Sequence, residues 1–125
     1  AGATVAGSDW VYSINSAYAT KIGRMVFING RVLLTTKSLT ATGNIIINNL
    51  PYTVNNANNA NSAITLSRVL NTTTSIVGMS ASITSNSTSV VLRMRTAAST
   101  SETVVNLGDI SDTFSFDFFG SYVAA

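Results

Sequence analysis

The sequence contains no cysteine and no histidine among its 125 residues. Without cysteine the chain can form no disulfide, no zinc–thiolate site and no thiol nucleophile. Without histidine it lacks the side chain that most often acts as a general base near neutral pH and that most often binds transition metals. These two absences remove the commonest routes to catalysis, so we expect a non-enzymatic protein with no catalytic residues, no bound metal and no cofactor.

Charged residues are also scarce. Seven basic and five acidic residues make up 10% of the chain, well below the roughly 25% that is usual in soluble domains. The basic residues form no cluster along the sequence, so we expect no nucleic-acid partner. In place of charges the chain has 17 serines, 17 threonines and 13 asparagines. Such a neutral surface suits contact with a partner, above all other copies of the chain; a neutral, Ser/Thr/Asn-rich monomer is the alternative.

Long hydrophobic runs are missing as well. The longest apolar stretch, residues 25–34, is interrupted by Asn29, Gly30 and Arg31, and it is too short to span a membrane. The first eight residues lack the basic segment and apolar stretch of a signal peptide. The length fits one domain over residues 1–125. Because the sequence begins without methionine, we expect this domain to be a piece of a longer protein.

What the sequence does have is alternation with a period of two. In residues 89–96 valine, leucine and methionine alternate with arginine, and in residues 113–118 three phenylalanines alternate with serine and aspartate. This pattern predicts half-buried strands. Further strands are predicted at residues 9–14, 18–22, 24–36, 44–48, 63–69, 75–83 and 102–105, with turns at 41–44, 71–74 and 85–88. No segment has a sustained helical period, so we predict an all-β fold, a β-sandwich or jelly roll.

The longest predicted strand, residues 24–36, has two apolar faces. Val26, Ile28, Val32 and Leu34 share the face that we assign to the core, and Gly30 in the middle is a candidate for a bulge or bend. On the opposite face the apolar side chains have no partner within the sheet. We therefore expect a second sheet or a subunit interface to cover a set of outward apolar residues: Met25, Phe27, Leu33 and, out of phase with its neighbours, Phe119.

Few residues could support chemistry. A serine–lysine pair would have to use Lys21 or Lys37, both in ordinary strand or turn contexts. The segment Gly108–Asp112 carries two of the five acidic residues and is most simply a turn before the last strand. A calcium ion could bind there, but the segment lacks the ligand density of a recognised calcium loop.

Aromatic and amide side chains are better candidates for binding, because an aromatic ring can stack on the apolar face of a sugar while amides hydrogen-bond its hydroxyls. The alternative is that these aromatics are core residues or cross-strand partners. The candidate ligand-binding residues are Trp10, Tyr12, Tyr18 and Tyr52, with Asn56, Asn58 and Asn59 in the polar run of residues 55–61.

One block of sequence is more specific than composition. It combines Tyr18, Lys21-Ile22-Gly23, Val26 with Gly30, Thr42-Gly43 and Leu50-Pro51-Tyr52, and the chain ends in Gly-Ser-Tyr-Val-Ala-Ala at residues 120–125. This arrangement resembles the C-terminal domains of bacteriophage tail fibres and tailspikes. The resemblance touches both halves of the chain, and the block from Lys21 to Tyr52 is its most specific part. In physical terms, Gly23 suits a hairpin turn and Pro51 suits the end of a strand.

The resemblance implies a β-sandwich that assembles as a homotrimer at the end of a fibre or spike, on the outside of the virion. It implies binding to polysaccharide on the bacterial surface, trimer registration, or both. It transfers no catalytic residue and no specific binding residue. Two alternatives stay open: a purely structural trimerisation cap of a longer fibre or depolymerase spike, and a stand-alone bacterial lectin.

Overall fold

Alternating sequence becomes strand almost throughout the computed structural model, which describes residues 2–5, 10–57, 61–97 and 100–125. The strands in these residues are β1 (Gly2–Val5), β2 (Val11–Ile22), β3 (Met25–Thr36), β4 (Thr42–Ile47), β5 (Ser62–Thr72), β6 (Gly78–Ile83), β7 (Val90–Arg95), β8 (Thr103–Val104) and β9 (Ile110–Val123). A single 3₁₀ turn, η1 (Leu107–Asp109), precedes β9. The described residues contain no α-helix, so the all-β prediction is confirmed.

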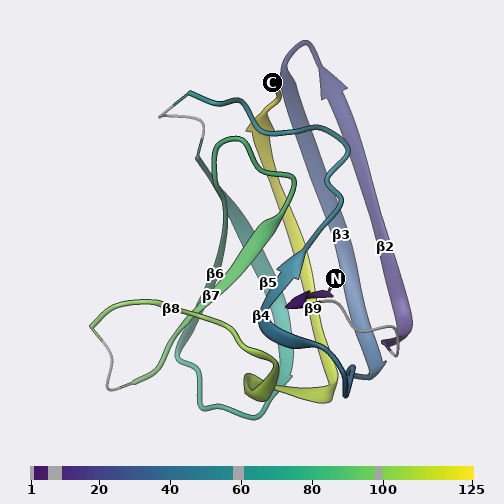
Figure 1. Ribbon diagram of the computed structural model, residues 1–125, viewed down its shortest axis with the longest axis vertical. Helices are drawn as coiled ribbons and strands as arrows, with labels where there is room; N and C mark the ends of the chain where they lie inside the picture. Colours follow the sequence, from purple (N-terminus) through teal and green to yellow (C-terminus); the bar gives the residue numbers. More distant parts are fainter. Residues whose placement is uncertain (1, 6–9, 58–60, 98–99) are drawn as a thin grey trace.

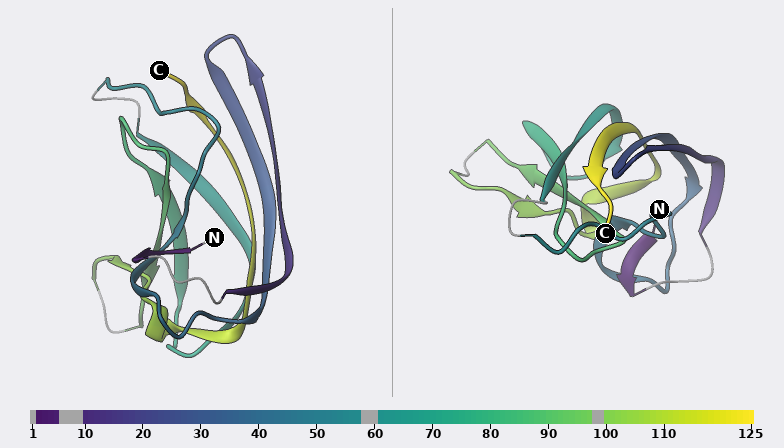
Figure 2. Two further views of the ribbon diagram at one scale, coloured as in Figure 1. Left: turned by 45° about the vertical axis from the view of Figure 1, so that its right-hand side comes forward. Right: turned by 90° about the horizontal axis from the view of Figure 1, so that it is seen from above.

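All strands belong to one antiparallel sheet in the order β1-β4-β7-β6-β5-β9-β3-β2, with β8 added beside β7. The sheet curls strongly, as Figure 1 shows. β2, β3 and β9 form one wall, and β4, β6 and β7 face them from the other side, most clearly in the left view of Figure 2. β5 pairs with both β9 and β6 and so connects the two walls. The inner side of the curl therefore encloses the core.

The core-facing residues follow the sequence pattern. Val26, Ile28, Val32 and Leu34 of β3 are at most 5% exposed, which confirms the core face predicted for that strand. The opposite wall contributes the alternating apolar residues of β7, and β9 contributes Phe114, Phe116 and Phe118, whose rings pack side by side. The period-two pattern holds because each of these strands has one face toward the enclosed core.

Several predicted boundaries are wrong. The predicted strands at residues 9–14 and 18–22, of which residue 9 is outside the described residues, form one continuous strand, β2, because residues 14–17 pair with β3 in an unbroken ladder. β9 extends five residues past Phe118 through pairing with β3 and β5. The strand at Gly2–Val5 was not predicted; it exists through pairing with β4, which a single segment of sequence does not reveal.

Two of the predicted turns have opposite outcomes. The turn predicted at residues 41–44 is wrong: β4 already begins at Thr42, and the chain reverses earlier. There the Ser38 hydroxyl accepts hydrogen bonds from the backbone N–H groups of Thr40 and Ala41, which is a serine turn that competes with the sequence signal of Gly43. The turn at residues 85–88 is confirmed, with Asn86 in the left-handed conformation.

Gly30 is not at a bulge. The pairing of β3 with both β2 and β9 continues in register through Gly30, so the predicted bulge is wrong. Gly30 lies directly opposite Phe118 on the inner side of the sheet, and a Cβ atom at position 30 would lie 2.5 Å from the ring. The glycine therefore makes room for an aromatic ring that covers it, a known arrangement in sheets.

The segment between β4 and β5 crosses the open end of the curl (Figure 1). Backbone hydrogen bonds join it to the β6–β7 turn at Leu50 and Val54 and to the end of β9 at Asn55. The buried Tyr122 hydroxyl donates a hydrogen bond of 2.9 Å to the Tyr52 carbonyl. These bonds fix the crossing segment to the β6–β7 turn on one side and to β9 on the other.

Candidate binding surfaces

The outer face of the wall formed by β2, β3 and β9 continues onto the paired part of β5. Because residues paired across an antiparallel ladder point to the same face, the register defines rows of neighbouring side chains. The outward-pointing row nearest the β2–β3 turn holds Ile22, Met25 and Val123; the next holds Thr20, Phe27 and Ser121; the third holds Tyr18, Asn29, Phe119 and Thr65; and the fourth holds Ser16, Arg31, Asp117 and Ser67.

The first three rows contain an exposed apolar cluster, which we name the outer patch: Tyr18, Ile22, Met25, Phe27 and Phe119. Their exposed fractions are between 37% for Met25 and 73% for Tyr18. The remaining residues of these rows are threonine, serine, asparagine and valine, so no described residue in the three rows is charged. Aromatic and methionine side chains without charge are typical of the centre of a protein interface.

The outer patch brings together residues that the sequence assigned to different roles. Met25, Phe27 and Phe119, predicted to lie in a trimer interface, share it with Tyr18, predicted to bind ligand. Leu33, the fourth predicted interface residue, is on the same face but is separated from the patch by the row of Arg31, and it is only partly exposed. The structure therefore groups three of the four candidate interface residues.

The fourth row is polar and forms the floor of a shallow depression, which we name the outer depression. It has a volume of about 350 Å³ and is lined by Ser16, Tyr18, Asn29, Gly30, Arg31, Asp117 and Phe118. Arg31 Nε lies 3.3 Å from Asp117 Oδ1, and Arg68 Nε lies 4.0 Å from Asp117 Oδ2. Two guanidinium groups thus share one carboxylate, and the cluster carries a net positive charge.

Arg68 reaches this cluster through an irregularity in β5. The register between β5 and β9 shifts between Ser67 and Leu70, so Arg68 lies in a bulge. Its φ is +50°, a left-handed conformation that costs a non-glycine residue on the order of 1 kcal/mol. In regular pairing, the neighbour of the outward-pointing Ser67 would point inward. The bulge instead places the Arg68 side chain beside Asp117.

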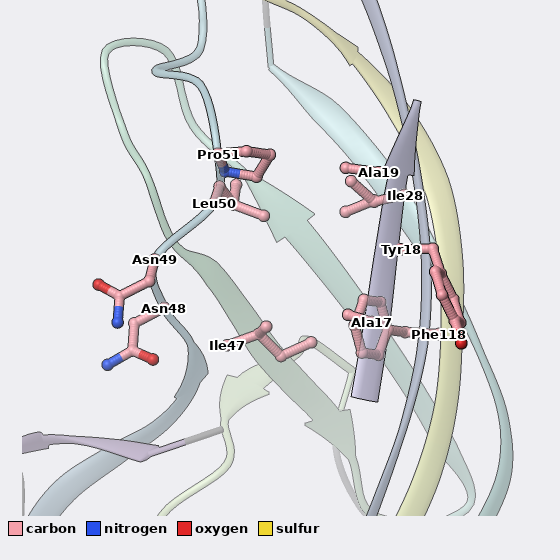
Figure 3. A pocket seen from close by; sticks show the side chains of 10 residues that line it. All are labelled: Ala17, Tyr18, Ala19, Ile28, Ile47, Asn48, Asn49, Leu50, Pro51 and Phe118. Atoms are coloured by element: carbon pink, nitrogen blue, oxygen red, sulfur yellow. The ribbon is translucent and has the colours of Figure 1, made fainter. Parts of the chain in front are cut away.

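A second concave site, the inner cleft, lies on the other side of β2 (Figure 3). Ala17, Ala19, Ile28 and Phe118 line one wall, and Ile47, Leu50 and Pro51 of the crossing segment line the other, with Asn48 and Asn49 at the rim. Its volume is about 240 Å³. The cleft exists because alanines on the inward side of β2 leave space that larger side chains would fill. Its walls are apolar, so it suits an apolar group.

The structure does not gather the predicted ligand-binding aromatics into one site. Trp10 and Tyr12 stack with ring centroids 6.4 Å apart and pack, half-buried, against the core; burial raises the pKa of the Tyr12 phenol. Tyr18 is on the outer face. Tyr52 is on the crossing segment, with Lys21 Nζ 4.6 Å from its ring centroid. Asn56 is exposed, whereas Asn58 and Asn59 are outside the described residues.

The residues weighed for catalysis or metal binding have structural partners. Lys37 Nζ donates hydrogen bonds to the carbonyls of Ile110 and Leu107. One oxygen of Asp109 accepts from the Asn106 backbone N–H and the other from the Thr74 hydroxyl. Within the described ranges, no three acidic side chains are grouped as metal ligands would be. Those ranges also contain no helix that is long and apolar enough to cross a membrane.

Comparisons with protein-family models, with curated proteins and with solved structures each return no match to this chain.

Sequence reasoning missed two groups of surface residues. Ile22 belongs to the outer patch, and its alternation with Thr20 and Tyr18 within the predicted strand at residues 18–22 was the signal that could have identified it. Arg31, Arg68 and Asp117 were not predicted to cluster. They meet only because β3 and β5 both pair with β9 and because β5 is bulged, and no local pattern in the sequence encodes either feature.

Proposed function

We propose that this chain is the tip domain of a bacteriophage tail fibre or tailspike, which assembles as a homotrimer and binds polysaccharide on the host cell surface from the outside of the virion. The sequence block from Tyr18 to Tyr52 supports the family assignment by resemblance. The observation that carries the assembly part of the proposal is the outer patch: five large apolar side chains, exposed on three adjacent strands, with no charge among them.

The size of the patch fits a subunit contact. A large aromatic side chain has roughly 150–250 Å² of surface, so five large side chains that are about half exposed leave roughly 400–600 Å² to cover. A standard interface uses about 800 Å² from each partner. The outer patch can therefore form the centre of such an interface, with the neighbouring threonine, serine and asparagine side chains as its polar rim.

The fold suits threefold packing. In the proposed assembly the two facing walls of the curled sheet act as a β-sandwich, and each copy forms one wedge around the axis. A cyclic trimer has a heterologous interface, so the outer patch of one copy must meet a different surface of the next. The inner cleft, with its apolar walls beside the same edge strand, is the surface that we propose for this contact.

Glycan binding is supported by the neutral polar surface around the patch. Exposed hydroxyls and carboxamides can both donate and accept hydrogen bonds with sugar hydroxyls, and the Tyr18 ring offers an exposed stacking face.

The leading alternative is a purely structural trimerisation cap. It is favoured by one specific observation. The patch that assembly would bury contains Met25, Phe27 and Phe119, the last being the most exposed phenylalanine, so these side chains would not be available to a glycan. In that case the aromatics serve assembly alone. A stand-alone lectin would instead be monomeric and would need another explanation for the patch.

Light scattering on the isolated chain, followed by binding to whole bacteria and to purified capsule and lipopolysaccharide, tests the proposal. We expect a mass of three times 13.1 kDa and specific binding to cells of the host. A trimer that binds neither cells nor glycans would favour the cap. A stable monomer would contradict both and would favour the lectin.

A further inference from the structure

The outer depression borders the outer patch but differs from it in chemistry. Three of its lining residues, Ser16, Tyr18 and Asn29, have exposed polar side chains that make no hydrogen bond to any other described residue. Each offers a donor or an acceptor to a ligand. The Tyr18 ring, 73% exposed, stands at the boundary between the patch and the depression.

The charge of the depression is unbalanced. Arg31 lines the depression, whereas Arg68 lies beside it on β5; each directs Nε toward Asp117, at 3.3 Å and 4.0 Å. A guanidinium carries five N–H donors, so in each arginine the remaining donors have no acceptor among the described residues. One carboxylate cannot neutralise two guanidinium groups. The site therefore has spare positive charge and spare planar donor geometry, the combination that favours a carboxylate ligand.

The position of Arg68 is a second, independent observation. A bulge and a left-handed backbone bring its side chain to the cluster. Bulges of this kind often re-aim a side chain beside a functional site, and residues held in strained conformations cluster at ligand-binding positions. If Arg68 served only as a solvated surface charge, regular strand geometry would serve equally well.

We propose that the outer depression binds a carboxylate-bearing sugar, such as a uronate residue of an acidic bacterial polysaccharide. This inference rests on the proposed glycan-binding function and narrows it to acidic glycans. The Arg31 and Arg68 guanidinium groups bind the sugar carboxylate through paired N–H donors. Asp117 holds the two arginines in place and accepts a hydrogen bond from a sugar hydroxyl, and Ser16 and Asn29 bind further hydroxyls. Tyr18 is at the edge of the outer patch, so in the proposed assembly the side of its ring that faces the depression is left free and stacks on the apolar face of the sugar.

Titration calorimetry with trigalacturonate, its methyl ester and a triglutamate peptide tests the proposal on the whole chain. The ester keeps the sugar but removes the charge, and the peptide keeps the charge but removes the sugar. We expect trigalacturonate to bind at least tenfold more tightly than either, since a charged hydrogen-bond pair typically changes affinity by about that factor. Raising the salt concentration should weaken this binding.

Charge-matched variants locate the site. Arg31→Gln and Arg68→Gln should each weaken trigalacturonate binding about tenfold. Arg95→Gln, which removes the same charge from an exposed position on β7, should leave it unchanged. Tyr18→Ala should weaken binding as well, which a site made of charge alone would not show. Circular dichroism verifies that each variant is folded.

Three results would overturn the inference: no binding of trigalacturonate, equal binding of the ester or the peptide, or an equal loss in Arg95→Gln. These results are separate from failure of the proposed function. A chain that trimerises and binds host cells through a neutral glycan keeps the function and loses the acidic site.

Discussion

Gly30 and Phe118 are directly opposite each other on β3 and β9, and the Phe118 ring occupies the space that a side chain at position 30 would need. A Cβ atom there would lie 2.5 Å from Cζ and 2.7 Å from Cε1 of the ring, and 2.8 Å from the Ser16 carbonyl oxygen. Neither the β2 backbone on one side nor the buried Phe118 ring on the other can move away easily to make room for a Cβ atom.

Gly30→Ala should therefore destabilise the protein by about 2 kcal/mol, a typical cost of overpacking a close contact. Urea denaturation of the variant and the parent measures the difference. The double variant Gly30→Ala/Phe118→Leu should lose less stability than the sum of the two single losses. Leucine is smaller than phenylalanine, so it relieves the clash with the alanine Cβ.

Two other glycines serve as controls for that measurement. A Cβ at Gly120 would lie 2.6 Å from Ile64 Cδ1, the end of a side chain, and no closer than 3.3 Å to backbone atoms, whereas at Gly78 nothing lies within 4 Å. Gly120→Ala should cost less than Gly30→Ala, and Gly78→Ala should stay within about 0.5 kcal/mol of the parent. If all three substitutions cost the same, the ring contact is not the cause.

Phe27→Ser should dissociate the proposed trimer without unfolding the subunit. Phe27 is 47% exposed and lies in the middle row of the outer patch, where a polar side chain removes apolar contact from the centre of an interface. Light scattering should change from three copies to one, with an unchanged β-sheet circular dichroism spectrum. Val77→Ser, at a position that is 63% exposed away from the patch, should leave the mass unchanged; the opposite pattern would place the interface elsewhere.

Stability should fall at high pH in part because of Tyr122. Burial raises the pKa of the Tyr122 phenol above its ordinary value of 10.0, so the folded state favours the neutral form. Its contribution is fully present below pH 10, the unfolded value, and is lost as pH rises through the higher folded pKa. Denaturation measured from neutral pH into this alkaline range should show a constant free energy of unfolding that then falls.

Tyr122→Phe tests the assignment. At neutral pH the variant should lose about 1 kcal/mol, because the Tyr52 carbonyl loses its hydrogen bond. In the alkaline range its fall should be shallower than that of the parent. Tyr18→Phe removes an exposed hydroxyl and is the matched control, with little change expected in either range.

The sequence predicted those parts of the fold that local alternation encodes. The core faces of β3, β7 and β9 were correct, because each strand has one buried and one exposed side. Pairing was not predictable in the same way. β1 and the full length of β9 depend on partners distant in sequence, and the position of Gly30 relative to Phe118 could not be known before β3 and β9 were placed together.

The candidate surfaces also differ in how far local alternation predicts them. Met25 and Phe27 were identified from alternation within one strand, and the structure puts them in one patch. The cluster of Arg31, Asp117 and Arg68 needed three strands in a defined register and a bulge in one of them. A polar residue in a strand normally indicates only which face is exposed to solvent. The sequence around each of these three residues therefore did not predict a site.

The backbone of Arg68 provides a direct test of whether that bulge exists. Glycine adopts a φ of +50° without strain, whereas alanine retains the penalty of the left-handed conformation. Arg68→Gly should therefore be more stable than Arg68→Ala by about 1 kcal/mol. At a regular strand position the order would be reversed, because glycine there loses more conformational entropy on folding. Ser67, the outward-pointing neighbour at a position in register, provides that control: Ser67→Gly should be less stable than Ser67→Ala. If the glycine variant were the less stable one at both positions, β5 would be regular at Arg68 and the Arg68 side chain would point away from Asp117.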